Sequence, residues 1–172
     1  TDWQHVKCKP VKILGAFHAP QGAEWDARVE KCILEHTKAK HSLFFRRMEA
    51  LPANVALVLI KACGVPRMNY TVRVQEPKVA RKACEQFDGC VTEAIEALSC
   101  LKLDAESETL LSLPTGMGGC GLTRMAEISP LAYAASKSQC GPKDERLSQD
   151  DLVTAHYQGV AQRLVESSHQ MK

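Results

Sequence analysis

The amino-acid sequence predicts a mainly α-helical protein, a helical bundle with a short β-hairpin at its amino end. After residue 23 apolar residues recur every three to four positions over most of the chain, which is typical of helices with one buried face. Alternation typical of strands is confined to the first twenty residues. Hydrophobic residues make up 45% of the 172 positions and charged residues 24%, so the chain can bury a core.

The strand-like stretch runs from His5 to Phe17. Its residues favour β-structure, Pro10 interrupts it, and the Leu14-Gly15 pair is suited to a strand-end turn. A break follows at residues 20–22, which read Pro-Gln-Gly. We therefore assign residues 1–20 to two short strands or a hairpin at the edge of a sheet.

Two helices are predicted next. The first runs from Glu24 to about Ala50, and one face of it carries Trp25, Val29, Cys32/Ile33, His36, Ala39/Lys40, Leu43 and Met48. Pro52 suits the first position of the second helix, which Gly64 can close. The middle of that helix, residues 55–60, is apolar on every side, so we expect it to be the central helix of the core.

The second half of the chain continues the helical pattern. A short basic element covers Val65 to Val74, and Pro77 opens a long amphipathic helix whose wet face includes Asp88. A short helix over Ala105 to Leu113 precedes a glycine-rich segment. Ser129 is predicted to cap a further helix that begins at Pro130. Beyond it we expect a polar linker and a last helix, with a capping box at Ser148–Asp151 and an end near Gln170.

The glycine-rich segment, Gly116 to Leu122, lacks the context of a phosphate-binding loop. Such a loop follows a strand and carries a Lys-Ser or Lys-Thr pair, whereas Thr123-Arg124 follows these glycines. A dinucleotide-binding fingerprint would require a βαβ unit, which is not predicted here. We expect a tight backbone crossing where side chains would clash.

Charge is unevenly distributed along the chain. Residues 1–82 hold 15 Lys/Arg and 7 Asp/Glu, whereas residues 83–172 hold 7 Lys/Arg and 13 Asp/Glu. The basic half suggests contact with a polyanion, and the acidic half suggests contact with solvent or other proteins. Chance clustering of solvated charges is the alternative.

Metal, cofactor and catalytic signals are weak. The eight cysteines include no C-x-x-C pair, so we expect reduced, buried thiols and neither a zinc site nor a disulfide framework. The strand candidates hold no pair of carboxylates for two-metal polymerase chemistry, and Asp150-Asp151 falls in a helix cap. No hydrolase motif surrounds the histidines. We therefore expect no cofactor, no metal and no catalysis by this chain alone.

Five short motifs occur in one order over residues 5–138. Together they resemble the region downstream of the catalytic palm in non-LTR (LINE-type) retrotransposon reverse transcriptases. Residues 11–16 resemble the K-x-L-G element, and residues 51–73 resemble the family's L-x-x-C-x-x-P-R stretch with its last Arg at Arg73. The remaining resemblances are Phe87-Asp88, Leu113-Pro114 with the glycines of 118–121, and the A-Y-x-A-S ending at residues 132–136.

This resemblance implies a domain plan and a binding role. Residues 1–20 would form the primer grip, residues 21–139 a thumb or connection domain, and residues 140–172 a linker and final helix. The catalytic Asp pair would lie upstream of Thr1, so the chain would be a fragment or a processed product. The expected nucleic-acid contacts are Lys7, Lys9, Lys12, Leu14, Gly15, Lys38, Lys40, Arg46, Arg47, Arg67, Asn69 and Arg73.

Two functions are compatible with this interpretation. The chain could be a non-catalytic thumb that binds RNA or an RNA–DNA duplex. Alternatively, it could be a reverse-transcriptase-derived structural subunit of a larger ribonucleoprotein, such as a mitochondrial ribosome, with protein partners docked on the acidic carboxy-terminal half. Either function places the protein inside the cell, in the nucleus or the mitochondrion. No apolar run approaches the roughly 20 residues that span a bilayer, so no membrane contact is expected.

Overall fold

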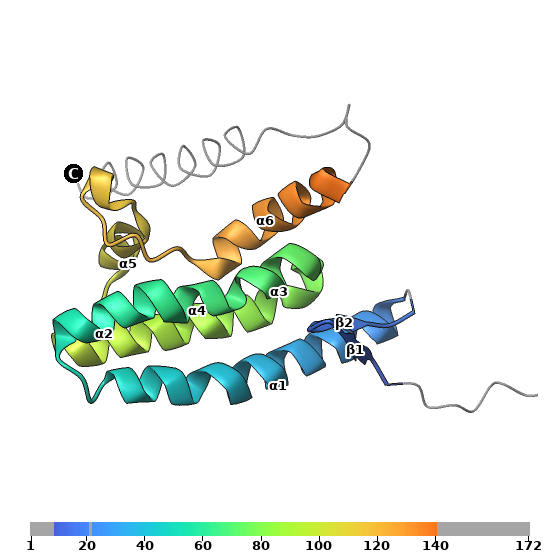
Figure 1. Ribbon diagram of the computed structural model, residues 1–172, viewed down its shortest axis with the longest axis horizontal. Coiled ribbons are helices and arrows are strands. Elements are labelled where there is room, and N and C mark those ends of the chain that lie inside the picture. The colour runs from blue at the N-terminus through green and yellow to red at the C-terminus, as the bar shows by residue number, and fades with distance from the viewer. Residues whose placement is uncertain (1–8, 21, 141–172) are drawn as a thin grey trace, which may run out of the picture.

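The structure is a computed structural model that describes residues 9–20 and 22–140 (Figure 1). It confirms a mainly helical fold with a short antiparallel hairpin at the amino end. The predicted linker and last helix, including Ser148–Asp151, lie outside the described residues. The elements are β1 Val11–Ile13, β2 Ala16–His18, α1 Ala23–Met48, α2 Ala53–Leu59, η1 Ile60–Gly64, η2 Val65–Met68, α3 Asn69–Val74, α4 Pro77–Ser99, α5 Ala105–Ser112, η3 Thr115–Met117 and α6 Met125–Cys140.

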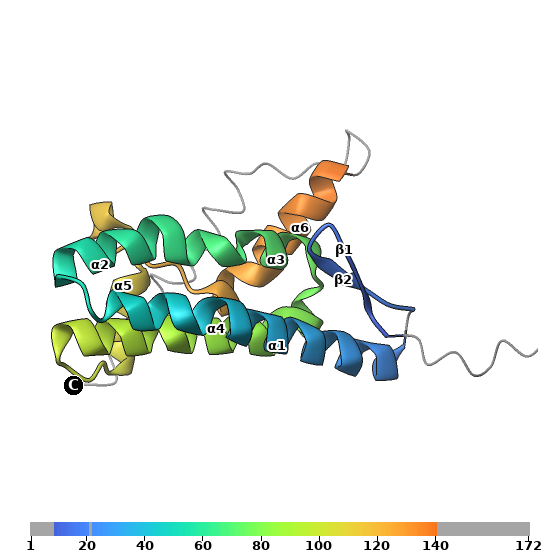
Figure 2. The same cartoon turned by 60° about the horizontal axis from the view of Figure 1, so that its bottom comes forward.

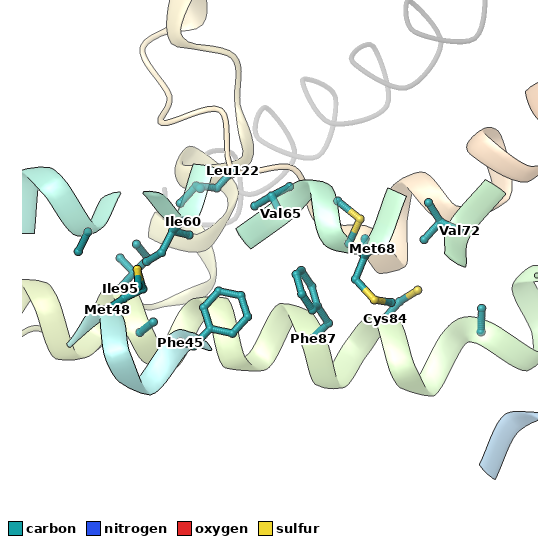
Figure 3. Close-up of a cluster of buried hydrophobic side chains, with 14 residues drawn as sticks. Phe45, Met48, Ile60, Val65, Met68, Val72, Cys84, Phe87, Ile95 and Leu122 are labelled. Atoms are coloured by element: carbon teal, nitrogen blue, oxygen red, sulfur yellow. The ribbon is translucent and has the colours of Figure 1, made fainter. Parts of the chain in front are cut away.

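The core forms where α1, α4 and the segment from α2 to α3 meet. α1 and α4 run side by side in the same direction, α2 to α3 lies along both, and α6 crosses α3 and α4 (Figures 1 and 2). Phe87 of α4 is buried in the middle of this core (Figure 3). Its ring packs edge-on against Phe45, with 5.4 Å between centroids, and against His41 at 5.2 Å. The predicted apolar stripe of α4 is thus confirmed at Phe87, and α4 is the central helix.

α2 is not the central helix of the core, contrary to the sequence prediction. Val55 is 43% exposed and Val58 63% exposed, while Ala56 and Ile60 are fully buried. The helix lies at the outside of the bundle and packs mainly on α4, so only one of its sides is covered by the described residues. The apolar composition of α2 favours burial of every side, but the described residues cover only one side of it.

Gly64 does not end a helix, which corrects a second prediction. The chain stays helical through it, with φ −76°, as the π-helical turn η1 passes into η2. A Cβ atom at this position would lie 2.9 Å from Cε1 of Phe44 and 3.3 Å from Cε1 of Phe45. The glycine therefore permits close approach to α1.

The buried face of α1 agrees with the prediction at Val29, Ile33 and Met48. Between them, Thr37, His41 and Phe45 are buried, whereas the predicted Lys40 and Leu43 are exposed. The buried stripe of a long straight helix drifts because 3.6 residues per turn does not match a fixed repeat of three and four. Next to the buried residues lies a second row of side chains, four residues apart, at positions 36, 40 and 44.

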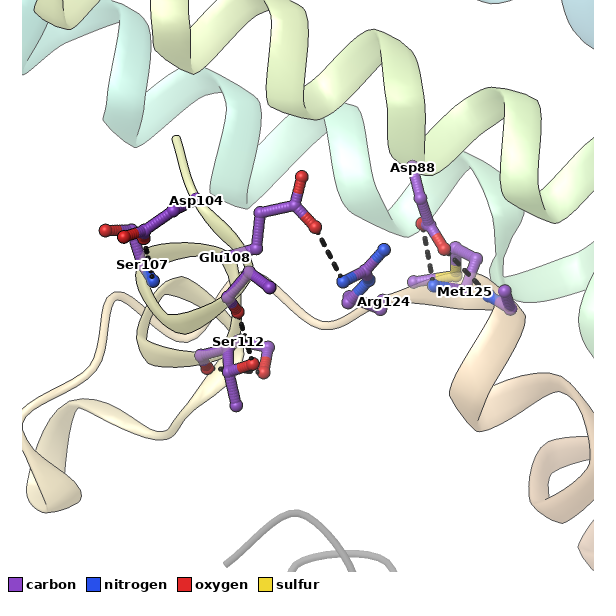
Figure 4. Close-up of polar contacts among 10 residues, drawn as sticks. Asp88, Asp104, Ser107, Glu108, Ser112, Arg124 and Met125 are labelled. Atoms are coloured by element: carbon purple, nitrogen blue, oxygen red, sulfur yellow. Dashed lines mark hydrogen bonds and ion pairs between the residues drawn. The ribbon is translucent and has the colours of Figure 1, made fainter. Parts of the chain in front are cut away.

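α6 begins five residues before the predicted start. Its first amides, on Met125 and Ala126, donate to the two carboxylate oxygens of Asp88 at 2.8 and 2.9 Å (Figure 4). Asp88 was expected on the wet face of α4 but is only 6% exposed. Pro130 lies inside the helix and is not its first residue. A carboxylate on α4 caps the helix, and no local sequence signal at its start announces that cap.

The glycine-rich segment makes the tight crossing that was predicted. A Cβ atom on Gly119 would collide with the carbonyl oxygen of Leu113 and would lie 2.6 Å from that of Leu110. Gly118 and Gly121 adopt positive φ values of 84° and 67°. The glycines are thus needed for backbone packing, and the segment holds together through a 2.7 Å hydrogen bond from the Gly121 amide to the Leu113 carbonyl.

Candidate nucleic-acid interface

All but one of the predicted contact residues lie within the described parts of the chain. Lys7 falls outside them, and each of the others is exposed. Exposure is the first requirement for contact with a large polyanion, but it does not bring the residues together. Only some of them share one surface, which is built from the hairpin, α1 and η2.

The hairpin turn packs against α3. Leu14 and Gly15 have positive φ values of 48° and 90°, so the chain reverses within two residues. Leu14 is 90% exposed at the tip. A Cβ atom on Gly15 would lie 3.1 Å from Cε1 of Tyr70, so the turn rests on that ring. Tyr70 is 46% exposed.

The opposite face of the hairpin packs against α1. Nζ of Lys12 donates to Nε2 of His36 at 3.0 Å, and the Lys12 ammonium lies 5.5 Å from the centre of the Phe17 ring. Phe17 pairs with Lys12 across the two strands and meets the His36 ring edge-on at 6.0 Å. These three side chains join the hairpin to α1. Figure 2 shows the hairpin beside that helix.

Farther along α1 the same row continues to η2. Residues 36, 40 and 44 are spaced four apart, so their side chains follow one stripe of the helix. At its end the Arg67 guanidinium lies 4.2 Å from the centre of the Phe44 ring. We name this surface the basic face and define it by Lys12, His36, Lys40, Phe44 and Arg67.

The structure does not join the other predicted residues to the basic face. Lys38 is two residues from Lys40 and points to another side of α1, since positions two apart do not face each other. No described contact links the remaining positions to the five residues of the face; these are Lys9, Arg46, Arg47, Asn69 and Arg73.

Several cations elsewhere on the bundle pair with carboxylates. Lys78 of α4 pairs with Asp26 of α1 at 2.9 Å, and Lys82 pairs with Glu30 at 2.6 Å. We call these four residues the paired edge. Within the described parts of the chain, none of the predicted contact cations forms an ion pair with a carboxylate; they are Lys9, Lys12, Lys38, Lys40, Arg46, Arg47, Arg67 and Arg73. Positive charge is therefore left available on the basic face.

Two histidines respond to this charge. Burial, then Lys12 and Lys40, lowers the pKa of His36 below its ordinary value. Burial, then Lys40, Arg67 and His36, lowers the pKa of His41 to about 4. Sequence reasoning placed His36 on the buried face of α1 and gave neither histidine a role at the surface. The lysines between the two histidines in the sequence, Lys38 and Lys40, were the signal that could have indicated a basic surface there.

The described residues offer little for metal binding. They contain no group of three or more His, Cys, Asp or Glu side chains that could hold an ion. The cysteines whose side chains are described are unpaired thiols, and Cys84 is buried as expected. Cys63 and Cys100 are exposed, which corrects the expectation of buried thiols. No helix among the described residues is long and apolar enough to cross a membrane.

The fold and the basic face together describe a helical bundle with an unneutralised cationic surface. In sequence the chain is similar to the retrotransposable element SLACS 132 kDa protein of Trypanosoma brucei gambiense, with 26% identity over 99 residues. The match covers 55% of this chain and 8% of the trypanosome protein, so the chain corresponds to a small part of it. No protein-family model and no solved structure matches the chain. The similarity supports a distant relationship to a retrotransposon protein.

Proposed function

We propose that this chain is a non-catalytic, thumb-like part of a reverse-transcriptase-related protein and that its basic face binds the phosphate backbone of RNA or an RNA–DNA duplex. The similarity to a retrotransposon protein supports the relationship. The observation that carries the binding role is the basic face itself, where cations from β1, α1 and η2 share one surface without a described carboxylate partner.

Phosphate contact suits this surface better than base recognition. Lysine and arginine neutralise backbone phosphates without reading sequence, and the five residues that define the basic face include no Asn or Gln. An exposed cation without a carboxylate partner can also bind a phosphate without first breaking an ion pair. Binding should therefore depend strongly on salt and weakly on sequence.

The test uses two triple variants that lose the same charge. In the first, Lys12, Lys40 and Arg67 of the basic face are changed to Gln. In the control, Lys31, Arg81 and Lys102 are changed to Gln; each is exposed and pairs with a glutamate. Fluorescence anisotropy with a labelled RNA–DNA duplex gives affinity over a range of salt concentrations.

The basic-face variant should bind more weakly, and its salt slope should fall by about one unit for each phosphate that is no longer neutralised. The control should keep the wild-type slope. Equal losses of affinity in the two variants would mean that binding depends only on the net charge of the chain, and this result would overturn the proposal. Absence of binding by the wild-type chain at low salt would also overturn it, and would favour a protein-docking subunit.

A further inference from the structure

The joint between the hairpin and α1 brings basic groups together without an acid. Lys12 comes from β1, and His36 and Lys40 come from α1. The 3.0 Å hydrogen bond from Lys12 to His36 links residues 24 positions apart in sequence. None of the three has a carboxylate partner among the described residues. Cationic groups that gather at a joint without an acid attract an anion to it.

The hydrogen bond shows which protonation state the free joint requires. A lysine ammonium only donates, so Nε2 of His36 must accept, and the ring must be neutral with its proton on Nδ1. A protonated ring would have no acceptor for Lys12 and would place two cations in contact. The neutral imidazole is therefore the form that fits the structure without a bound anion.

We propose that Lys12, His36 and Lys40 form a phosphate clamp between the hairpin and α1, and that the clamp tightens when His36 gains a proton. This inference rests on the proposed function and adds regulation by pH to it. A phosphate oxygen placed between Lys12 and His36 accepts a hydrogen bond from each, so the ammonium no longer needs the imidazole as its acceptor. The anion also offsets the repulsion between the two cations.

The direction of the pH effect follows from linkage. Burial has the largest effect on the pKa of His36 and lowers it, and the charges of Lys12 on β1 and Lys40 on α1 lower it further. The Phe17 ring on β2, which meets the imidazole edge-on, carries no charge. His41 stays neutral near pH 6 because its own pKa is about 4. Anion binding raises the pKa of His36, and by reciprocity uptake of a proton strengthens anion binding. Affinity for phosphate groups should rise as pH falls.

The first experiment measures affinity for the labelled duplex at about pH 8 and about pH 6, where an ordinary histidine titrates. The wild-type chain should bind about fivefold more tightly at the lower pH, at the low end of typical coupling between sites. His36→Gln should abolish that ratio. The matched control is His18→Gln, because His18 is exposed on the hairpin but lies on the strand face away from Phe17. An unchanged ratio in His36→Gln would overturn the clamp while leaving the proposed function in place.

The second experiment does not depend on nucleic acid. Sulfate is the probe, because its charge does not change over this pH range and its oxygens accept hydrogen bonds as phosphate oxygens do. NMR of the imidazole resonances of the whole chain gives the pKa of His36 with and without sulfate. The pKa of His36 should rise with sulfate, and Lys12→Gln should remove most of the rise. A sulfate-independent pKa of His36 would overturn the clamp, whatever the duplex measurements show.

Discussion

One side of α1 faces α4, and the other carries the hairpin and lies beside η2 (Figure 2). On the α4 side, lysines meet carboxylates across the two helices at Asp26–Lys78 and Glu30–Lys82. On the other side, lysines and an arginine meet a histidine and two aromatic rings. The same residue types thus hold helices together on one side of α1 and leave positive charge available on the other. This difference predicts that the second side of α1, and not the first, contacts phosphates.

The largest expected effect lies in the core beneath the α4 side. Phe87→Ala removes a fully buried ring that packs on Phe45 and His41, so it should lower the free energy of unfolding by about 3–5 kcal/mol. Val58→Ala, at an exposed position of α2, is the control and should change it by less than about 0.5 kcal/mol. Urea unfolding monitored by circular dichroism measures both. Similar losses would mean that α2 is as central as α4.

The next effect is the pH dependence of stability, in which two buried groups oppose each other. Burial, then Lys40, Arg67 and His36, lowers the pKa of His41 to about 4, so its contribution to stability is lost as pH falls from about 6.5 towards 4. Burial raises the pKa of Asp88 to about 6, although the amides of Ala126 and Met125 oppose the rise. The contribution of Asp88 is present at low pH and lost as pH rises through 6.

Because His41 and Asp88 change the free energy of unfolding in opposite directions as pH falls, the variant Asp88→Asn tests the contribution of each. Without the carboxylate, the free energy of unfolding should fall by about 3 kcal/mol between pH 6.5 and pH 4, because Asp88 no longer offsets the titration of His41. The wild-type chain should lose less over the same interval. Urea midpoints at a series of pH values provide the measurement, with His41→Gln in the Asp88→Asn chain as the control that should flatten the profile. A wild-type loss as steep as that of Asp88→Asn would contradict this account of Asp88.

The smallest effect concerns the paired edge. Changing Lys78 and Lys82 to Gln removes three ion pairs that are exposed to solvent, two at Lys78 and one at Lys82, so the free energy of unfolding should change less than in either of the preceding tests. Duplex affinity should keep its wild-type salt slope in this double variant. A reduced salt slope would show that the paired edge contacts phosphates and would erase the distinction between the two sides of α1.

Local signals were enough to predict some elements and not others. The hairpin followed from alternation and a turn pair at Leu14-Gly15, and α1 and α4 followed from their apolar spacing and prolines. The start of α6 could not be predicted because its cap, Asp88, lies 37 positions from Met125. The exposure of Val58 depends on which elements surround α2, and composition does not specify neighbours.

The candidate site divides in the same way. Residue type and the family resemblance were sufficient to nominate Lys12, Lys40 and Arg67. Their grouping around His36 depends on how the hairpin packs on α1, a contact between residues 24 positions apart. The contact of Arg67 with the Phe44 ring was also missed. The two residues lie in different elements, so no regular sequence spacing indicates that they meet.

The most direct test of the central claim is a map of backbone amide shifts during titration of an isotope-labelled chain with an RNA–DNA duplex at low salt. We predict that the largest shifts fall in residues 11–18, in the second half of α1 and in η2, and that added salt reverses them. Amides beside Lys78 and Lys82 should move little. Shifts concentrated along the paired edge or on α5, with the hairpin unchanged, would contradict the assignment of the basic face as the nucleic-acid interface.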